Sequence, residues 1–533
     1  MAGAAAGGWT PARSAAGARS PWLIVGVISI ATFMEVLDTS IANVSLGHIA
    51  GSLSVSPDES TWVLTSYLVS NAVIIPISGW LSSVIGRKRY YMLSVALFTA
   101  ASLLCGLAPN IQVLILARIL QGIGGGGLAP SEQSMLADTF PPAKRGAAFA
   151  AYAFVIIVAP VIGPTIGGYV TDNASWHWIF LVNVPVGILS LFLVNSFVDE
   201  PKILVTERLA RLKGGLRVDY IGFALVAIGL GSLELFLDRG QREDWFASGF
   251  IVATAIIAAV AIVFLVIWEA TRREPIVDVR LMANRNFAAV LLVMFTTGVI
   301  LFGSIQLIPQ MLQQVFGYTA TDAGLAMTFG GLATVAVVPI AGTLTGKVSP
   351  RLLIGLALIV SAIALGHLTT LNTNSSFGDF AWARAYGAVA LPFLFVPLSA
   401  AAYVGLDPRK SGEASSLLNV ARNLGGSVGI ALSQAWLSIE GQVRQSGLVN
   451  HLNPLAPNYP SALANLEATL RASGLAAAAA TEAAQGQLYR IVARQAQMLA
   501  YLDVYRALMV YTLCALPVIF LLKSGKSAGG GAA

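Results

Sequence analysis

The sequence predicts an all-α integral membrane protein that crosses the bilayer fourteen times. Of its 533 residues, 56% are hydrophobic and only 11% are charged, whereas a soluble domain carries about 25% charged residues. The mean hydropathy is +0.75. The apolar runs are about 20 residues long, the length of a spanning helix, and they lack the alternation of a membrane β-barrel. Because lipid offers no hydrogen bonds to the backbone, such segments must be helical.

Fourteen apolar segments are the predicted spans. The first is too long for the apolar region of a signal peptide, so we interpret it as a retained span. The segments cover residues 22–47, 60–82, 90–108, 111–137, 146–170, 177–197, 219–238, 248–270, 287–309, 322–346, 351–371, 383–405, 414–438 and 499–522.

The basic residues support this number and predict the orientation. With the N-terminus inside, the cytoplasmic segments carry 22 of the 32 Lys and Arg residues. The short outer loops carry only Arg239 and Arg242, with Arg384 near a span end. Cytoplasmic loops are enriched in Lys and Arg, so both termini should be cytoplasmic.

The spans divide into six, two and six. A Gly-x-Leu stretch runs into a basic turn both at Gly79 and at Gly342, which is a faint sign of two repeated halves. Residues 439–498 form the only long polar stretch, and we expect a short helical hairpin outside the membrane. The predicted parts are a cytoplasmic tail (1–21), a six-helix bundle (22–198), linkers with two extra helices (199–286), a second six-helix bundle (287–522) and a second tail (523–533).

Ionisable residues within the spans are the first candidates for function, because each costs about 2.5–3.5 kcal/mol to insert. Glu35 and Asp38 are three residues apart, so both carboxyl groups share one helix face. Two such acids in a low dielectric resist ionising together, and one of them could bind and release a proton. Arg118 needs a buried partner, for which Asp38 and Glu35 are the candidates, and Gln121 could extend the network. Structural pairing or a vestibule lining is the alternative.

Further polar residues in the spans are candidates for a substrate cavity. Arg422 is flanked by Asn419 and Asn423 on one face, although helix packing with an interhelical hydrogen bond is the favoured alternative there. Asn43, Gln121, Glu132 and Glu234 complete the set, and Glu234 could instead face water near the outer end of its span.

Span 146–170 holds a dense cluster of prolines and glycines, which includes Gly163, Pro164, Gly167 and Gly168. The cluster predicts a bend or a close helix crossing. The glycine-rich stretch 122–127 has no preceding strand and no following Lys-Ser/Thr, so we interpret it as a small-residue helix face rather than a phosphate loop.

The sequence gives no reason to expect an enzyme. It lacks the common soluble-enzyme motifs. The two cysteines, Cys105 and Cys514, lie in apolar segments and predict neither a disulfide nor a metal site. We therefore expect no metal and no cofactor. The net charge of +6 is spread over the loops, which fits contact with lipid rather than with nucleic acid.

Taken together, these residues resemble the major facilitator superfamily, and more closely its fourteen-helix drug:proton antiporters of the EmrB/QacA type, in particular the EmrB branch. The resemblance covers nearly the whole chain. The matching motifs are Leu37-Asp38 to Asn43-Val44, Gly79-x-Leu81 to Gly86-Arg87-Lys88, Arg118-Ile-Leu-Gln121-Gly122, and Gly163-Pro164-x-x-Gly167-Gly168.

The resemblance implies a major facilitator fold with two six-helix bundles and two extra central helices. It also implies a role for Asp38 in coupling, for Arg118 in proton transfer, for the Gly79–Lys88 motif in locking the halves, and for the last motif in antiport. Members of the EmrB branch work with a periplasmic adaptor of the EmrA type and an outer-membrane channel of the TolC type. Two departures stand out: Ser83 replaces an Asp, and Glu35 and Glu234 stand near expected Gln positions.

The predicted function is therefore proton-driven export of hydrophobic or amphipathic compounds across the bacterial cytoplasmic (inner) membrane. A facilitator for a specific metabolite and a non-transporting membrane sensor or assembly subunit are the alternatives. The glycine-proline motif of span 146–170 disfavours an importer, and the lack of a predicted soluble sensory domain disfavours a sensor.

Overall fold

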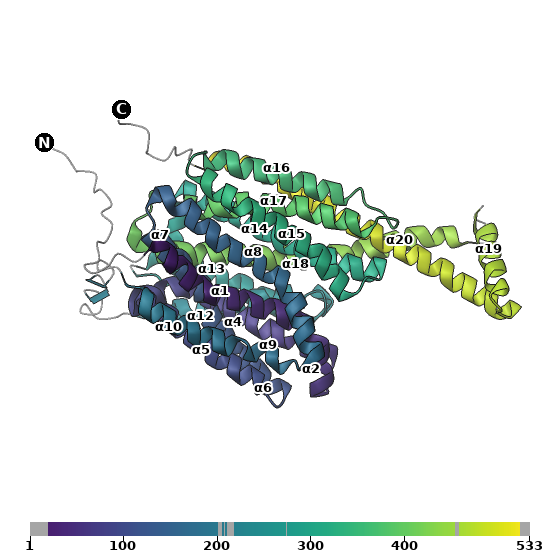
Figure 1. Ribbon diagram of the computed structural model, residues 1–533, viewed down its shortest axis with the longest axis horizontal. Coiled ribbons are helices and arrows are strands. Elements are labelled where there is room, and N and C mark those ends of the chain that lie inside the picture. Colours follow the sequence, from purple (N-terminus) through teal and green to yellow (C-terminus); the bar gives the residue numbers. More distant parts are fainter. Residues whose placement is uncertain are drawn as a thin grey trace.

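The computed structural model is helical and elongated (Figure 1). It describes residues 20–200, 205, 206, 208, 209, 218–272, 274–453 and 458–522. Most of both predicted tails and most of the linker after residue 200 lie outside these residues. Within the described chain, thirteen helical segments are long and apolar enough to cross a membrane.

Ten helices lie within the described residues 20–200. They are α1 (Pro21–Val44), α2 (Leu46–Leu53), α3 (Pro57–Ser60), α4 (Trp62–Ile85), α5 (Arg87–Gly106), α6 (Ile111–Gly125), α7 (Leu128–Thr139), α8 (Pro142–Asn173), α9 (His177–Leu181) and α10 (Asn183–Phe197). The predicted span 111–137 is divided into α6 and α7, because the chain turns at Gly126 and Gly127.

The central pair, α12 and α13, and the helices of the second half follow in the chain. The long helices are α12 (Tyr220–Arg239), α13 (Gly249–Thr271), α14 (Arg285–Phe316), α15 (Ala320–Thr345), α16 (Pro350–Leu368), α17 (Phe377–Ala402), α18 (Ser411–Val449), α19 (Tyr459–Ala472) and α20 (Ala477–Cys514). The 3₁₀ helices are η1 (Trp245–Ala247), η2 (Val279–Ala283), η3 (Pro408–Lys410), η4 (Asn450–Leu452) and η5 (Leu516–Leu521).

Helix starts follow local capping chemistry. Thr319 and Asp322 form a reciprocal capping box at α15, and Ser376 and Asp379 form another at α17. Such pairs satisfy backbone N–H groups that have no partner within the helix. The prolines inside α4, α14, α15 and α17 are tolerated because neighbouring helices stabilise the interrupted backbone.

Helix α18 completes the set of fourteen spans that the sequence predicts. It is too polar to count among the thirteen apolar segments, since it contains Arg422 and several Asn, Ser and Gly residues. It nevertheless packs against α4, α7, α14 and α20. Gly425 and Gly429 allow this, because an added Cβ would lie 2.8 Å from the carbonyl carbon of Phe295 and 2.7 Å from Val299 Cα, respectively. A polar span is therefore accommodated inside the protein rather than against lipid.

The two halves meet through two equivalent glycine contacts. An added Cβ at Gly79 of α4 would lie 2.9 Å from Glu413 Cα, in the first turn of α18. An added Cβ at Gly342 of α15 would lie 3.3 Å from Ala147 Cα, in the first turns of α8. Each contact joins the second span of one half (α4 or α15) to the fifth span of the other half (α18 or α8). The faint Gly-x-Leu repeat therefore marks two related inter-half crossings, as expected of repeated halves.

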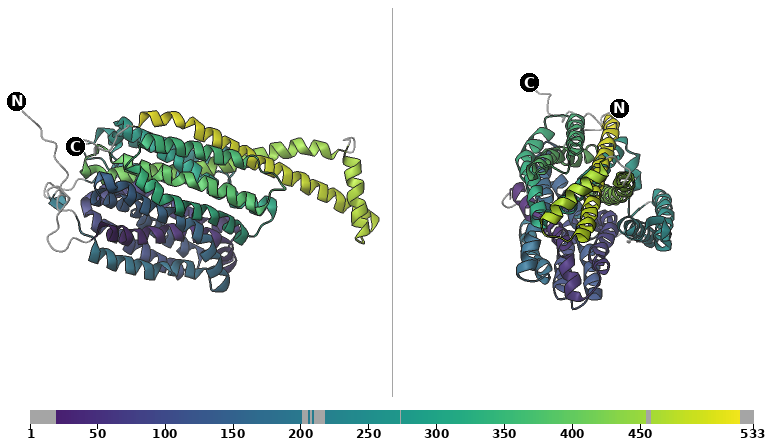
Figure 2. Two further views of the ribbon diagram at one scale, coloured as in Figure 1. Left: turned by 45° about the horizontal axis from the view of Figure 1, so that its top comes forward. Right: turned by 90° about the vertical axis from the view of Figure 1, so that its right-hand side faces the viewer.

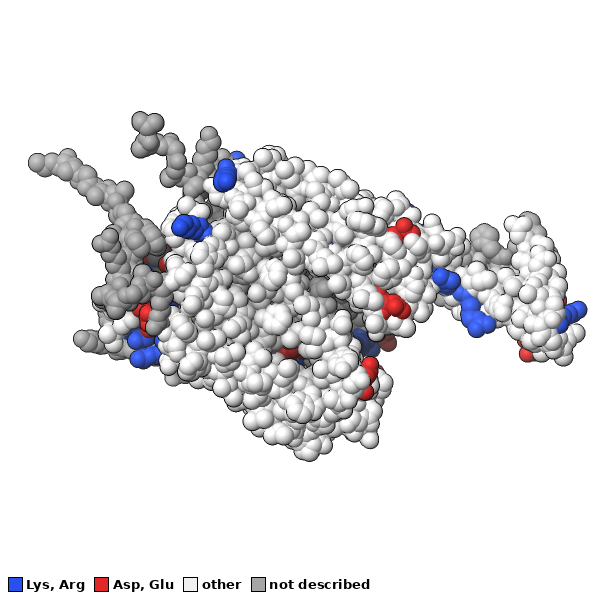
Figure 3. Space-filling view, in the orientation of Figure 1, with Lys and Arg blue, Asp and Glu red and all other residues white. Residues whose placement is uncertain are grey.

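The end at which α1 begins and the described chain finishes, at Leu522, is here called the terminal side (Figure 1). Helices α12 and α13 pack on each other and lie beside the two halves (Figure 2), where α12 contacts α4 and α18. In the space-filling view, Lys, Arg, Asp and Glu gather at the two ends, while the body between them is almost uncharged (Figure 3). This distribution matches a protein whose flank faces lipid.

The polar segment 439–498 differs from the predicted short hairpin. Helix α18 continues without a break to Val449, and α20 begins at Ala477 and runs on into the last span. Together with α19, these extensions project from the body, opposite the terminal side (Figures 1 and 2). We call residues 439–498 the arm. Ala- and Gln-rich sequence has high helix propensity, so the helices continue beyond the apolar residues.

The side chains of Arg239 and Arg384 are both buried. Arg239 is 6% exposed and donates to Thr61, and Arg384 lies two turns inside α17 and is 3% exposed. Arg239 is the last residue of α12, as its predicted position at an outer loop implies, whereas Arg384 lies further inside its helix than predicted, because α17 begins at Phe377.

Candidate transport site

A fully buried ion pair lies in the interior of the first half. Arg118 Nη1 of α6 donates to Asp38 Oδ2 of α1 at 2.6 Å, and both side chains are 0% exposed. Of the two carboxylates considered as partners for Arg118, Asp38 is therefore the one in contact. A buried pair is stable only when further hydrogen bonds satisfy its remaining polar atoms.

Those hydrogen bonds come from Gln121 of α6 and from two further helices, α10 and α5. Asp38 Oδ1 accepts from Asn183 Nδ2 of α10 at 2.6 Å and from Gln121 Nε2 at 3.0 Å. Gln121 also donates to Ser102 Oγ of α5 at 2.8 Å. Charge-assisted bonds of this kind are about twice as strong as neutral ones, so the network fixes the position of the Asp38 carboxylate beside Arg118.

Only some of the hydrogen-bond donors of the Arg118 guanidinium group have partners. Its Nε donates to the carbonyl of Val63 at 3.0 Å, and its Cζ lies 4.3 Å from the centre of the Tyr67 ring. The Nη2 atom is buried and has no hydrogen-bond partner within the described structure. An incompletely satisfied buried cation is costly, so this arginine depends strongly on the charge of Asp38.

Glu35 lies one turn from Asp38 but makes separate contacts. Its Oε1 accepts from Tyr67 Oη at 3.3 Å and from Asn71 Nδ2 at 3.4 Å, both on α4. Tyr67 therefore contacts Glu35 through its hydroxyl group and Arg118 through its ring. Glu35 is only partly buried, in contrast to Asp38.

The second half contributes a cation to the molecule's interior. Arg422 of α18 contacts Asn423 through Nε at 3.4 Å, and its Cζ lies 5.9 Å from the centre of the Phe395 ring. Its Nη1 is buried without a hydrogen-bond partner in the described structure. Asn419 instead bridges the halves, donating to Gln133 Oε1 of α7 at 2.9 Å.

The remaining acids are separate from the ion pair. Glu132 of α7 is 0% exposed and accepts from Tyr91 Oη at 2.9 Å. Glu234 of α12 is 4% exposed and accepts from Ser427 Oγ of α18 at 2.8 Å. The alternative that Glu234 faces water is therefore wrong. Asn43, by contrast, is exposed in the last turn of α1.

The glycine-proline motif lies in α8 and packs on α1. An added Cβ at Gly167 would lie 2.8 Å from Ile41 Cγ2, and one at Gly163 would meet Ser40. Gly168 has open space instead, and the side chain of Pro164 lies outside the described residues. Gly163 and Gly167 thus place α8 against the helix that carries Asp38.

The terminal side of the interface between the halves is polar and closely packed. Arg87 of α5 forms an ion pair with Asp138 of α7. Arg87 Nη2 also donates to Ser411 Oγ of α18 at 2.8 Å, and Ser411 donates to Asp138 Oδ1 at 3.0 Å. These contacts connect the first half to the start of α18.

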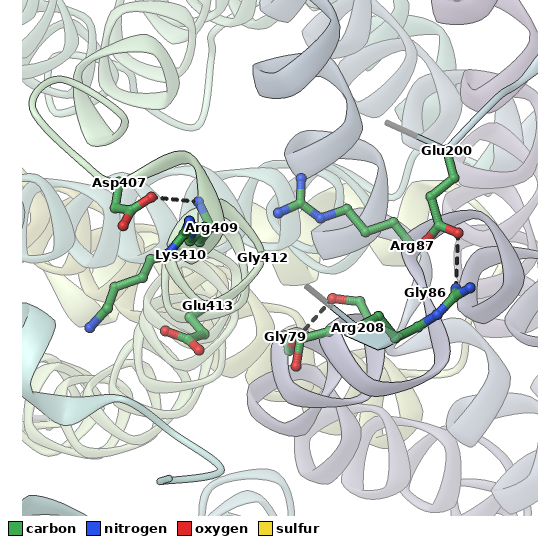
Figure 4. Close-up of a pocket in the computed structure, with 12 residues that line it drawn as sticks. Gly79, Gly86, Arg87, Glu200, Arg208, Asp407, Arg409, Lys410, Gly412 and Glu413 are labelled. Atoms are coloured by element: carbon green, nitrogen blue, oxygen red, sulfur yellow. Dashed lines mark hydrogen bonds and ion pairs between the residues drawn. The ribbon is translucent and has the colours of Figure 1, made fainter. Parts of the chain in front are cut away.

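A pocket of about 290 Å³ lies beside this contact, between the two halves (Figure 4). Gly79 and Ser83 line it from one half, and Arg409 and Glu413 line it from the other. Gly86 adopts φ of 102°, and an added Cβ there would clash with Arg208, which pairs with Glu200 at 2.9 Å. Lys88 lies apart, with its Nζ 2.9 Å from the carbonyl of Asn195.

Sequence reasoning missed several members of these networks. Asn183, Ser102 and Tyr67 contact the candidate residues, and Asp138 pairs with Arg87. A polar residue within a span was the available signal for Asn183 and Ser102. No sequence pattern indicates which distant helix each one contacts.

The architecture defines a class: a polytopic membrane protein of two related helical halves around buried ionisable groups. The chain belongs to the Major Facilitator Superfamily, whose family model matches residues 28–430, and within it to the EmrB type. It is therefore a transporter rather than an enzyme.

The relatives support this placement. The chain is 38% identical to the Multidrug export protein EmrB of Escherichia coli (strain K12), over 83% of this chain and 85% of that one. It is 33% identical to the Fatty acid resistance protein FarB of Neisseria gonorrhoeae, over 97% and 98%. Among solved structures, the proton:xylose symporter XylE shares the fold at a TM-score of 0.59 and 14% identity, covering 93% of this chain and 95% of that chain.

Proposed function

We propose that the protein is a secondary active exporter that moves hydrophobic or amphipathic compounds out of the cell in exchange for protons. The observation that carries this proposal is the fully buried Asp38–Arg118 ion pair. A group that can lose its charge by binding a proton, next to a cation that depends on this charge, is suited to coupling. The relatives named as multidrug export proteins support the substrate class.

The proposed coupling step is protonation of Asp38. A neutral Asp38 no longer attracts Arg118, whose buried guanidinium then lacks a counter-ion. The arrangement in which both are enclosed becomes less favourable, and the halves move so that Arg118 regains polar contacts. Glu35, partly buried and linked to the same site by Tyr67, would accept the proton first or contact a cationic substrate.

The moving parts would be the two six-helix bundles, 22–198 and 287–522. In this arrangement the contacts of Gly79 and Arg87 close the terminal side, which we place in the cytoplasm of a bacterium, with the protein in the inner membrane. Opening this side would require separating α4 from the first turn of α18. Protons and substrate would use the same path in alternation.

The family resemblance adds the partners. We propose that the exporter is the inner-membrane subunit of a tripartite pump, with an adaptor of the EmrA type and a channel of the TolC type. Copurification of the intact protein with such partners is the direct test of this part, and it is independent of the test of proton coupling.

Proton coupling is tested with purified protein in vesicles that enclose a pH-sensitive dye. An imposed pH gradient should drive uphill movement of at least one transported probe. The probes tested are cationic, neutral and anionic amphipathic compounds. Asp38→Asn should abolish uphill movement while exchange without a gradient continues. Asp172→Asn, at an exposed position, is the matched control. Normal uphill transport by Asp38→Asn would overturn the coupling proposal.

The direction of transport separates an exporter from a metabolite importer. Accumulation of a transported probe in inverted vesicles, which expose the cytoplasmic face, supports export. Accumulation only in right-side-out vesicles would support the importer, and no flux in either for any probe would favour a non-transporting subunit.

A further inference from the structure

A buried arginine also lies in the half of the molecule that lacks the Asp38–Arg118 pair. Arg384 of α17 is 3% exposed, and its Nε has no hydrogen-bond partner within the described structure. An arginine keeps its charge in proteins. An enclosed guanidinium without a counter-ion costs several kcal/mol, so its charge must be compensated.

The surrounding helices supply no free carboxylate. Arg384 is enclosed by α14, α15 and α16 as well as by its own helix. The only acidic residues on these four helices are Asp322 and Asp379. Both are exposed and serve in the capping boxes at the first turns of α15 and α17. Neither forms an ion pair with Arg384.

A small cavity adjoins Arg384. It measures about 20 Å³ and is lined by Arg384, by Ser304 and Ser361, and by apolar residues such as Ile300 and Leu365. Ser361 Oγ is buried and, like Arg384 Nε, has no hydrogen-bond partner in the described structure. Two residues that each have a buried donor without a partner thus line the same small cavity.

We propose that this cavity binds a single small inorganic anion of the size of chloride. The anion would accept hydrogen bonds from Arg384 and Ser361 and would neutralise the arginine. A cavity of about 20 Å³ has room for one water-sized particle but not for an organic headgroup. This site lies among α14, α16 and α17, apart from the Asp38–Arg118 pair, and is independent of the proposed export function.

The site is tested by anion titration of the purified full-length protein at constant ionic strength. Replacing gluconate with chloride should raise the melting temperature in a saturable way, because a ligand that binds only the folded state stabilises it. Bromide should do the same. Arg384→Gln should abolish the halide dependence, whereas Arg471→Gln, at an exposed arginine of the arm, should leave it unchanged.

Ser361→Ala provides a milder variant if Arg384→Gln does not fold. Loss of one hydrogen bond to a charged group should weaken halide binding about tenfold. A melting temperature independent of halide, or a halide effect that survives in both variants, would overturn the proposal. Competition between chloride and a long-chain carboxylate that depends on Arg384 would also contradict it, because the cavity is too small for such a ligand.

Discussion

Asn183 donates a 2.6 Å hydrogen bond to Asp38, although the two residues are 145 positions apart in the chain. This bond connects α10 to the ion pair of α1 and α6. Asn183 therefore helps to position the carboxylate on which proton coupling is proposed to depend, and it is the first target for a test.

Asn183→Leu should lower proton-driven transport about tenfold. Asp38 loses one hydrogen-bond donor, and a hydrogen bond to a charged group is worth about 1.5–3 kcal/mol, so the carboxylate is held less firmly beside Arg118. Uphill flux in vesicles under a fixed pH gradient checks this. Asn195→Leu changes an exposed position on the same helix and should leave the flux unchanged. An unchanged flux in Asn183→Leu would remove this residue from the coupling site.

Arg118→Lys should abolish uphill transport although it preserves the charge. A lysine ammonium group lacks the planar fork of a guanidinium and cannot reach Asp38, Gln121 and the Val63 carbonyl together. An unsatisfied buried acceptor costs about 1–3 kcal/mol, so thermal stability should also fall. Arg506→Lys, at an exposed arginine, is the control. Full activity of Arg118→Lys would mean that charge alone suffices.

Gly79→Ala should favour opening of the terminal side. The new Cβ would lie 2.9 Å from the Cα of Glu413. A backbone atom of a packed helix cannot move aside without a substantial energetic cost. Overpacking costs about 1–3 kcal/mol, which corresponds to at least a fivefold shift in the equilibrium between closed and open forms. Distances between spin labels at the terminal-side ends of α5 and α18 report it. Gly26→Ala, where the Cβ has open space, controls for helix propensity and should leave the distances unchanged.

Lys410→Met should lower stability at neutral pH, and its difference from the wild type should shrink as pH rises through the raised pKa of Lys410. The hydrogen bond to Asp278, at 2.5 Å, raises the pKa of Lys410. A raised pKa in the folded state gives stability that is fully present below the ordinary lysine pKa, about 10.4, and is lost as pH rises through the raised value. Melting temperatures between pH 9 and 12 should therefore fall more steeply in the wild type. Equal slopes would contradict this, and Lys144→Met, at an exposed lysine, should behave as the wild type.

The all-helical membrane fold was predictable because it depends on composition and on the length of apolar runs. The motifs around Asp38, Gly79, Arg118 and Gly163 were also visible in the sequence, because each is local. The span in α18 was predicted as the apolar segment 414–438, and the basic residues of the loops supported its inclusion. The orientation of the chain across the membrane, with both termini in the cytoplasm, remains a prediction, and so do the boundaries of the two bundles.

Other features depended on contacts between distant segments. The sequence offered both Glu35 and Asp38 as partners of Arg118, and only the tertiary structure, in which the side chain of Arg118 reaches Asp38, decided for Asp38. The arm was expected to be a separate hairpin, because an apolar run ends where lipid ends, whereas a helix can continue as far as its backbone propensity allows.

The sequence by itself determined that this chain spans the membrane many times and which residues are costly to place there. Tertiary structure decided which of these residues compensate one another. Asp38 and Arg118 share a hydrogen-bond network, while Arg384 has no carboxylate partner on the four helices that enclose it. The physical reason is that a charge's energy depends on the atoms within a few ångströms, and these come from helices whose neighbours the sequence does not specify.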